Sequence, residues 1–276
     1  MKKSLALMVT GIAVAGLLTG CNQGSKSNVP MVKTGFAITG SGQNAVVKSD
    51  FQKVFSFFIP SAIALSPPLL VDSTGLNVNL AEAWMVVKEV EFENEELPGQ
   101  AEVDGDEIEF EGPFFIDLLS NAPVSFGDSL IPQIGYRRVK MDLHESSAIP
   151  AAAPAGLNGK SLYFSGSVNG VAFTYAADDS TELEISGPNP IIPTDSMDML
   201  AVIRMADLFK KINLSSINVS TNIDTTNRVA ATNPCPLIDP SANDLYTCFR
   251  KGIGTEANFG NDDGDMDLDG SDETVE

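Results

Sequence analysis

The segment from Leu162 to Tyr175 restricts the possible folds of this chain more than any other. Apolar side chains alternate with polar or small ones on both sides of a central Asn169-Gly170 pair, at Leu162, Phe164, Val168, Val171, Phe173 and Tyr175. Both residues of a two-residue hairpin turn adopt a positive φ angle, which asparagine and glycine tolerate best. The segment therefore predicts two antiparallel strands joined by a tight turn.

A period of two recurs along much of the chain and favours an all-β fold. Alternating apolar positions occur in 51–59, 84–92, 108–118 and 139–143. In the second of these runs, strict alternation places on one face Trp84, Val86, Val90 and Phe92. Many short strands within about 200 residues indicate an antiparallel β-sandwich, immunoglobulin-like or transthyretin-like, with at most one short helix near 206–212.

The first 20 residues have the order of parts found in an export signal. Two lysines precede an apolar stretch from Leu5 to Leu18, and two small residues follow before Cys21. This stretch of roughly 14 residues is shorter than the approximately 20 that a transmembrane helix needs. We therefore expect residues 1–20 to be a signal peptide that is removed on export.

The tetrapeptide Leu18-Thr19-Gly20-Cys21 resembles the lipobox of bacterial lipoproteins. The resemblance implies cleavage before Cys21, which becomes the N-terminus and carries a thioether-linked diacylglyceryl group and an amide-linked acyl chain. Each buried CH₂ group contributes about 0.8 kcal/mol, so three acyl chains anchor a protein permanently. Asn22 stands where an aspartate would imply the inner membrane, so the resemblance places the chain in the cell envelope, at the outer membrane. Residues 21–34 would be the lipidated N-terminus and a flexible tether.

The charge of the chain excludes one class of partner. The net charge is −20, and it becomes −22 once the two lysines of the signal peptide are removed. A surface of this charge repels nucleic acid, and no basic stripe interleaved with aromatic residues opposes that effect. Nucleic-acid binding is therefore excluded.

Two cysteines remain once Cys21 is assigned to lipid. Cys235 and Cys248 are separated by twelve residues. An even pair in an oxidising compartment favours a disulfide, which would close a loop of about 14 residues. A nucleophilic thiol or a metal-binding pair is the alternative, and the lack of a nearby histidine disfavours it.

The segment from Glu256 to Glu276 contains nine acidic residues and no basic one. The ligand positions 1, 3, 5 and 12 of a calcium loop are filled by Asp265, Asp267, Asp269 and Glu276, with Gly270 at position 6. Position 8 is Asp272, where such loops usually carry a hydrophobic residue. The segment is predicted to be a disordered acidic tail, with calcium binding as the alternative.

Candidate catalytic groups are few. His144 is the only histidine. Its place in the alternation puts it on a solvated face, so we expect an ordinary surface histidine and not a catalytic base. No Gly-x-Ser-x-Gly elbow is present. Asp117 is flanked by apolar residues and is predicted to cap a turn. A carboxylate pair is the remaining option for an enzyme, and three glutamates share one strand face at the spacing of glycosidase pairs: Glu89, Glu91 and Glu93.

Four segments resemble an uncharacterised family of bacterial lipoprotein domains with a β-sandwich fold, at 82–92, 112–119, 135–140 and 162–173. The resemblance implies this fold and an envelope location, and it carries over no catalytic residue. We expect a β-sandwich domain over 35–230, with an internal boundary near 146–160 as an option, followed by a disulfide loop and acidic tail over 231–276.

These observations predict a non-enzymatic, lipid-anchored envelope protein that serves in binding, adhesion or surface structure. Its membrane partner is the lipid bilayer, and its second partner would be a protein or a glycan. Apart from calcium in the tail, no cofactor is expected. The alternatives are an envelope hydrolase that uses paired carboxylates and a subunit of a surface assembly.

Overall fold

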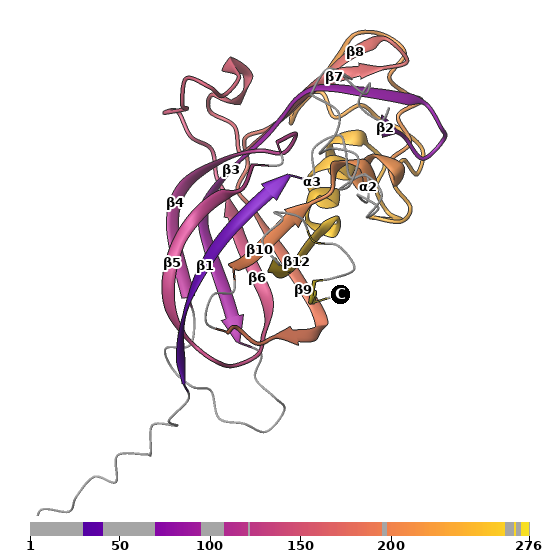
Figure 1. Ribbon diagram of the computed structural model, residues 1–276. Helices are drawn as coiled ribbons and strands as arrows, with labels where there is room; N and C mark the ends of the chain where they lie inside the picture. Colours follow the sequence, from indigo (N-terminus) through magenta and orange to yellow (C-terminus); the bar gives the residue numbers. More distant parts are fainter. Residues whose placement is uncertain are drawn as a thin grey trace, which may run out of the picture.

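The computed structural model describes residues 30–40, 70–94, 108–120, 122–194, 198–262, 268 and 272–275. These residues form two curled β-sheets that face each other (Figure 1). The all-β sandwich predicted from the alternating pattern is therefore confirmed. None of the helices in the described ranges combines the length and the apolar content that a membrane crossing would require.

The first sheet has four strands. Their order is β12 (Ala257–Asp262), β10 (Asp198–Ile203), β1 (Met31–Gly40) and β5 (Val124–Pro132). Strands β1 and β10 run parallel, while the other neighbours are antiparallel. The sheet thus joins strands from both ends of the described chain.

The second sheet has eight strands. Along its main path the order is β11 (Thr221–Ile223), β8 (Val171–Ala177), β7 (Leu162–Val168), β3 (Asn77–Asn94), β6 (Tyr136–Leu143) and β9 (Thr181–Ile191). Two more strands pair with β3, namely β2 (Leu70–Val71) and β4 (Ile108–Asp117). The loop near 146–160, which contains the short helix η1 (Ala155–Leu157), connects two strands that both pair with β3.

The hairpin predicted at Asn169-Gly170 is present between β7 and β8. Both residues have positive φ angles, 47° and 81°. Val168 pairs directly with Val171, so the turn contains two residues and sets the register of both strands.

Strand β3 departs from the predicted alternation. Its register against β4 and β6 shifts between Val87 and Glu89. From Ala83 up to the shift the core receives odd-numbered residues of β3, and after the shift it receives even-numbered ones, namely Ala83, Met85 and Val87, then Val90 and Phe92. The prediction that Trp84 and Val86 share a face with Val90 and Phe92 was wrong, because a β-bulge inserts one residue and reverses the faces.

Two α-helices lie within the described ranges. Helix α2 (Met205–Lys210) confirms the short helix expected near 206–212. Helix α3 (Leu245–Thr255) was not predicted. The Asp244 side chain accepts a hydrogen bond of 2.7 Å from the amide of Thr247, which is the contact of a helix N-cap. Both helices pack into the same core as the sheets.

The expected limits of the domain need correction at both ends. Strand β1 begins at Met31, inside the predicted tether. At the other end, α3 and β12 belong to the fold. The described part of the predicted disordered tail is also packed: Thr274 pairs with Gly260, and Val275 is fully buried. The segment packs because it contains apolar residues between the acidic ones, and Leu268 and Val275 are buried.

Candidate functional site

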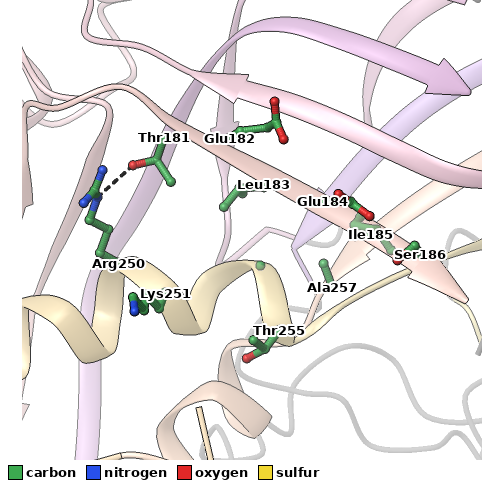
Figure 2. A pocket seen from close by; sticks show the side chains of 11 residues that line it. Thr181, Glu182, Leu183, Glu184, Ile185, Ser186, Arg250, Lys251, Thr255 and Ala257 are labelled. Atoms are coloured by element: carbon green, nitrogen blue, oxygen red, sulfur yellow. Dashed lines mark hydrogen bonds between the residues drawn. The ribbon is translucent and has the colours of Figure 1, made fainter. Parts of the chain in front are cut away.

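A groove runs along the outer edge of β9. Strand β9 is the last strand of the eight-stranded sheet, and among the described strands it pairs only with β6. Helix α3 and the start of β12 lie on the other side of the groove (Figure 2). The groove has a volume of about 560 Å³. It lies between β9 of the second sheet and β12 of the first, two strands that belong to separate sheets.

The floor of the groove is apolar and its rim is polar. Leu183, Ile185 and Ala257 form the floor, and each is at least nine-tenths buried. The rim carries Thr181, Ser186, Arg250, Lys251 and Thr255. An apolar floor with a few polar groups around it is the usual composition of a ligand-binding site.

Gly254 allows α3 to approach β9 closely. A Cβ atom at this position would lie 3.3 Å from Cδ2 of Leu183, which is tighter than an ordinary van der Waals contact. An added Cβ would therefore require the Leu183 side chain to shift by a few tenths of an ångström.

Arg250 joins the helical wall to the strand. Its Nε lies 2.9 Å from Oδ2 of Asp179 and donates to Oγ1 of Thr181 at 2.9 Å, as Figure 2 shows for the second contact. The Tyr246 hydroxyl donates to Oδ1 of Asp179 at 2.7 Å. Burial, followed by this hydrogen bond, raises the pKa of Tyr246. The tyrosine therefore stays neutral, and the network holds α3 in place.

Lys251, the next residue of the helix, pairs with Asp239. Its Nζ lies 2.6 Å from Oδ2 of Asp239, while Oδ1 accepts from the hydroxyl and the amide of Ser241. The hydrogen bonds from Lys251 and then from Ser241 lower the pKa of Asp239 to about 2. This carboxylate thus holds the loop that contains Asp239 against α3.

The ion pair of Asp239 predicts a pH dependence of stability. Because its pKa is lowered in the folded protein, the pair stabilises the fold above the unfolded value near pH 4 and loses this effect as the pH falls to about 2. We expect Asp239→Asn to be less stable than wild type at about pH 5 and equal to it at about pH 2 in urea unfolding. A difference that stays constant over this range would contradict the assignment.

The outward surface of the sheet next to the groove is strongly acidic. Cross-strand register places on one face of β4, β3, β6 and β9 the eight carboxylates Glu109, Glu111, Glu89, Glu91, Glu93, Asp142, Glu182 and Glu184. We call this surface the acidic face. Two cations lie among these residues: Arg138 contacts Glu93 at 3.0 Å and Glu184 at 3.3 Å, and Lys140 pairs with Glu93. The hydrogen bond that Lys140 donates to Glu93 raises the pKa of Lys140.

The predicted candidates for catalysis lie outside the groove. His144 is exposed, and its amide donates to the carbonyl of Val86. Asp117 caps a turn as predicted, because its Oδ1 accepts from the amide of Leu119 at 3.0 Å. Glu89, Glu91 and Glu93 belong to the acidic face and do not line the groove. Among the described residues, no three metal-binding side chains are grouped so that they could hold an ion.

The predicted disulfide between Cys235 and Cys248 is present, and both residues are fully buried. It ties the loop at Cys235 to the first half of α3. The other predicted site residues lie outside the described residues, namely Cys21 for lipid and Asp265, Asp267, Asp269 and Glu276 for calcium. Lipid attachment and calcium binding therefore stay predictions.

Sequence reasoning missed the groove, although both of its walls left a signal. Asp244 with Thr247 three residues later is a capping pattern, and Leu245, Phe249 and Ile253 follow at a spacing of four. On the other wall, Leu183 and Ile185 alternate with glutamates, as in a half-buried strand. Neither signal indicates that the two elements lie side by side.

Comparison with known proteins found no matching family model, no matching curated protein and no matching solved structure. The resemblance to lipoprotein domains therefore rests on the sequence segments alone.

Proposed function

We propose that this chain is a non-enzymatic, lipid-anchored protein of the bacterial envelope that binds a partner molecule in the groove between β9 and α3. The observation that carries the proposal is the groove itself, with its apolar floor, its polar rim and an open strand edge as one wall. The ladder between β9 and β6 holds one wall, and the contacts of Tyr246 and Arg250 with Asp179 hold the other, so the site is formed before a ligand arrives.

The side chains around the groove support binding rather than chemical catalysis. Thr181 accepts a hydrogen bond from Arg250. The Thr255 hydroxyl lies 3.0 Å from the carbonyl of Gly252 and 2.9 Å from Oε1 of Glu256, and that same oxygen is already paired with Lys211. A nucleophilic hydroxyl requires an adjacent base that is able to take its proton, and the one carboxylate here is engaged in an ion pair. The carboxylate of Glu182 points away from α3 (Figure 2).

The position of β1 supports display from a membrane. The first strand begins at Met31, ten residues after Cys21. The intervening chain spans at most about 35 Å when fully extended. A lipid on Cys21 would therefore keep the fold near the bilayer surface.

Capture experiments with the lipid-free mature protein test the binding function. We expect the wild type to retain material from envelope extracts, and Thr255→Trp to lose it, because an indole at the exposed Thr255 would fill the groove. The matched control is Leu130→Trp, a change at a 63% exposed residue on β5, at the other end of the first sheet.

Equal capture by all three proteins would contradict a role of the groove in binding. The anchor has its own test in the full-length chain: Cys21→Ser should release the protein from membranes and abolish labelling by a fatty-acid analogue. Continued labelling of that variant would contradict the lipid attachment.

A further inference from the structure

We propose that the groove binds an extended peptide whose side chains alternate between basic and apolar, and that this peptide adds to β9 as an outer strand. The inference rests on the proposed binding function and names the chemistry of the partner. Its support comes from the backbone of β9, the path of the C-terminal segment and the charges beside the groove.

The backbone of β9 presents hydrogen-bonding groups to the groove. In an antiparallel ladder, successive residues direct their N–H and C=O groups to opposite sides. The amide of His144 donates to the carbonyl of Val86 on β3. The preceding residue, Leu143, therefore directs its N–H and C=O groups to β9, where it pairs with Thr181. By alternation, the amides and carbonyls that face the groove belong to Glu182, Glu184 and Ser186. An edge strand of this kind accepts another extended chain.

The chain already places its own extended segment at the same junction. The amide of Val275 donates to the carbonyl of Phe259 on β12 at 3.0 Å, and the carbonyl of Val275 accepts from Asn189 on β9 at 3.2 Å. Residues 272–275 thus hydrogen-bond to both sheets. The groove begins two residues away from Phe259, at Ala257. A bound peptide would continue a pairing that this segment starts.

The two faces of an added strand would meet different surroundings. Side chains on one face would lie beside Glu182 and Glu184, whose positions on β9 belong to the acidic face. Side chains on the other face would lie over the floor formed by Leu183, Ile185 and Ala257. Because successive residues of a strand point to opposite faces, the best partner alternates basic and apolar residues.

Charge also favours a different chain over a second copy of this one. The acidic face has eight carboxylates and two cations among the described residues. The whole chain has a net charge of −20. Pairing two β9 edges would bring glutamates of both copies together, which costs stability, whereas a cationic peptide is attracted from a distance.

Fluorescence anisotropy with a short, end-blocked peptide of alternating lysine and valine tests the inference on the mature protein. We expect binding that weakens with salt. The same peptide with glutamate in place of lysine should not bind. A third peptide with N-methyl groups on alternate amides keeps its charge and loses hydrogen-bond donors, so its affinity should fall by about tenfold or more. Equal binding of the methylated peptide would overturn strand addition.

Two variants of one residue separate backbone pairing from charge. Glu184→Gln removes the carboxylate and keeps the amide, whereas Glu184→Pro also removes an amide that faces the groove. Proline is tolerated in edge strands, and a thermal melt checks the fold. We expect the proline variant to bind the peptide more weakly than the glutamine variant. Equal affinities in two folded variants would overturn the pairing.

The outcomes for the peptide and for the binding function remain distinguishable. If Thr255→Trp abolishes capture from envelope extracts while the lysine–valine peptide fails to bind wild type, the groove binds a partner of another chemistry and the peptide inference is wrong. If neither the peptide nor any extract component depends on the groove, both proposals fail. If the wild type forms dimers and the Thr255→Trp variant is monomeric, the groove binds a second copy of this chain instead.

Discussion

Replacing Phe249 with alanine should lower the free energy of unfolding by about 3–5 kcal/mol. Phe249 is fully buried on α3 and is in contact with four aromatic rings, with centroid distances between 5.0 and 6.3 Å, those of Phe164, Phe173, Tyr175 and Phe209. These rings belong to β7, β8 and α2. Truncation would therefore leave a cavity at the point where the helix is held against the second sheet.

Urea unfolding of Phe249→Ala and of two controls measures this effect. Leu237→Ala truncates a side chain that is 77% exposed, and it should change the unfolding free energy by about 0.5 kcal/mol or less. Phe249→Leu keeps most of the apolar volume and should cost about 1.5 kcal/mol or less. If the alanine variant at Phe249 were as stable as the leucine variant, α3 would not depend on this aromatic contact.

Removing the disulfide with Cys235→Ala and Cys248→Ala together should lower the free energy of unfolding by about 3 kcal/mol. The bond joins residues 13 positions apart, so its loss gives the unfolded chain more freedom. The folded state changes little, because alanine replaces a buried cysteine of similar size. The effect should appear as a lower denaturant midpoint.

A reductant provides the control for the disulfide. It should shift the midpoint of the wild type toward that of the double variant, and it should leave the double variant unchanged. Equal midpoints for the oxidised wild type and the double variant would show that the bond does not stabilise the fold. Because Cys248 lies on α3, peptide binding to the groove should weaken together with stability.

Local patterns predicted the elements whose structure depends on neighbouring residues. The Asn169-Gly170 pair determined a hairpin because only such residues adopt its φ angles readily. The turn cap at Asp117, the helix near Met205 and the surface position of His144 could also be read from the sequence. In each case, a few adjacent residues decide the conformation.

The prediction for β3 shows the limit of inference from neighbouring residues in the sequence. Glu89, Glu91 and Glu93 were correctly assigned to a solvated face, but the bulge before Glu89 could not be foreseen. A bulge costs little locally and is selected by the strands on both sides, here β4 and β6. The faces of Trp84 and Val86 were therefore decided by pairing over long sequence distances.

The sequence by itself determined the strand-rich class of the fold, the hairpin, the disulfide partners and the acidic character of the surface. Only the tertiary structure decided that β9 ends a sheet and that α3 lies beside it, with Leu183 and Ala257 on one floor. The physical reason is that an edge is defined by the absence of a neighbouring strand. Which strands become neighbours depends on how all apolar faces are buried together, so no single segment carries that information.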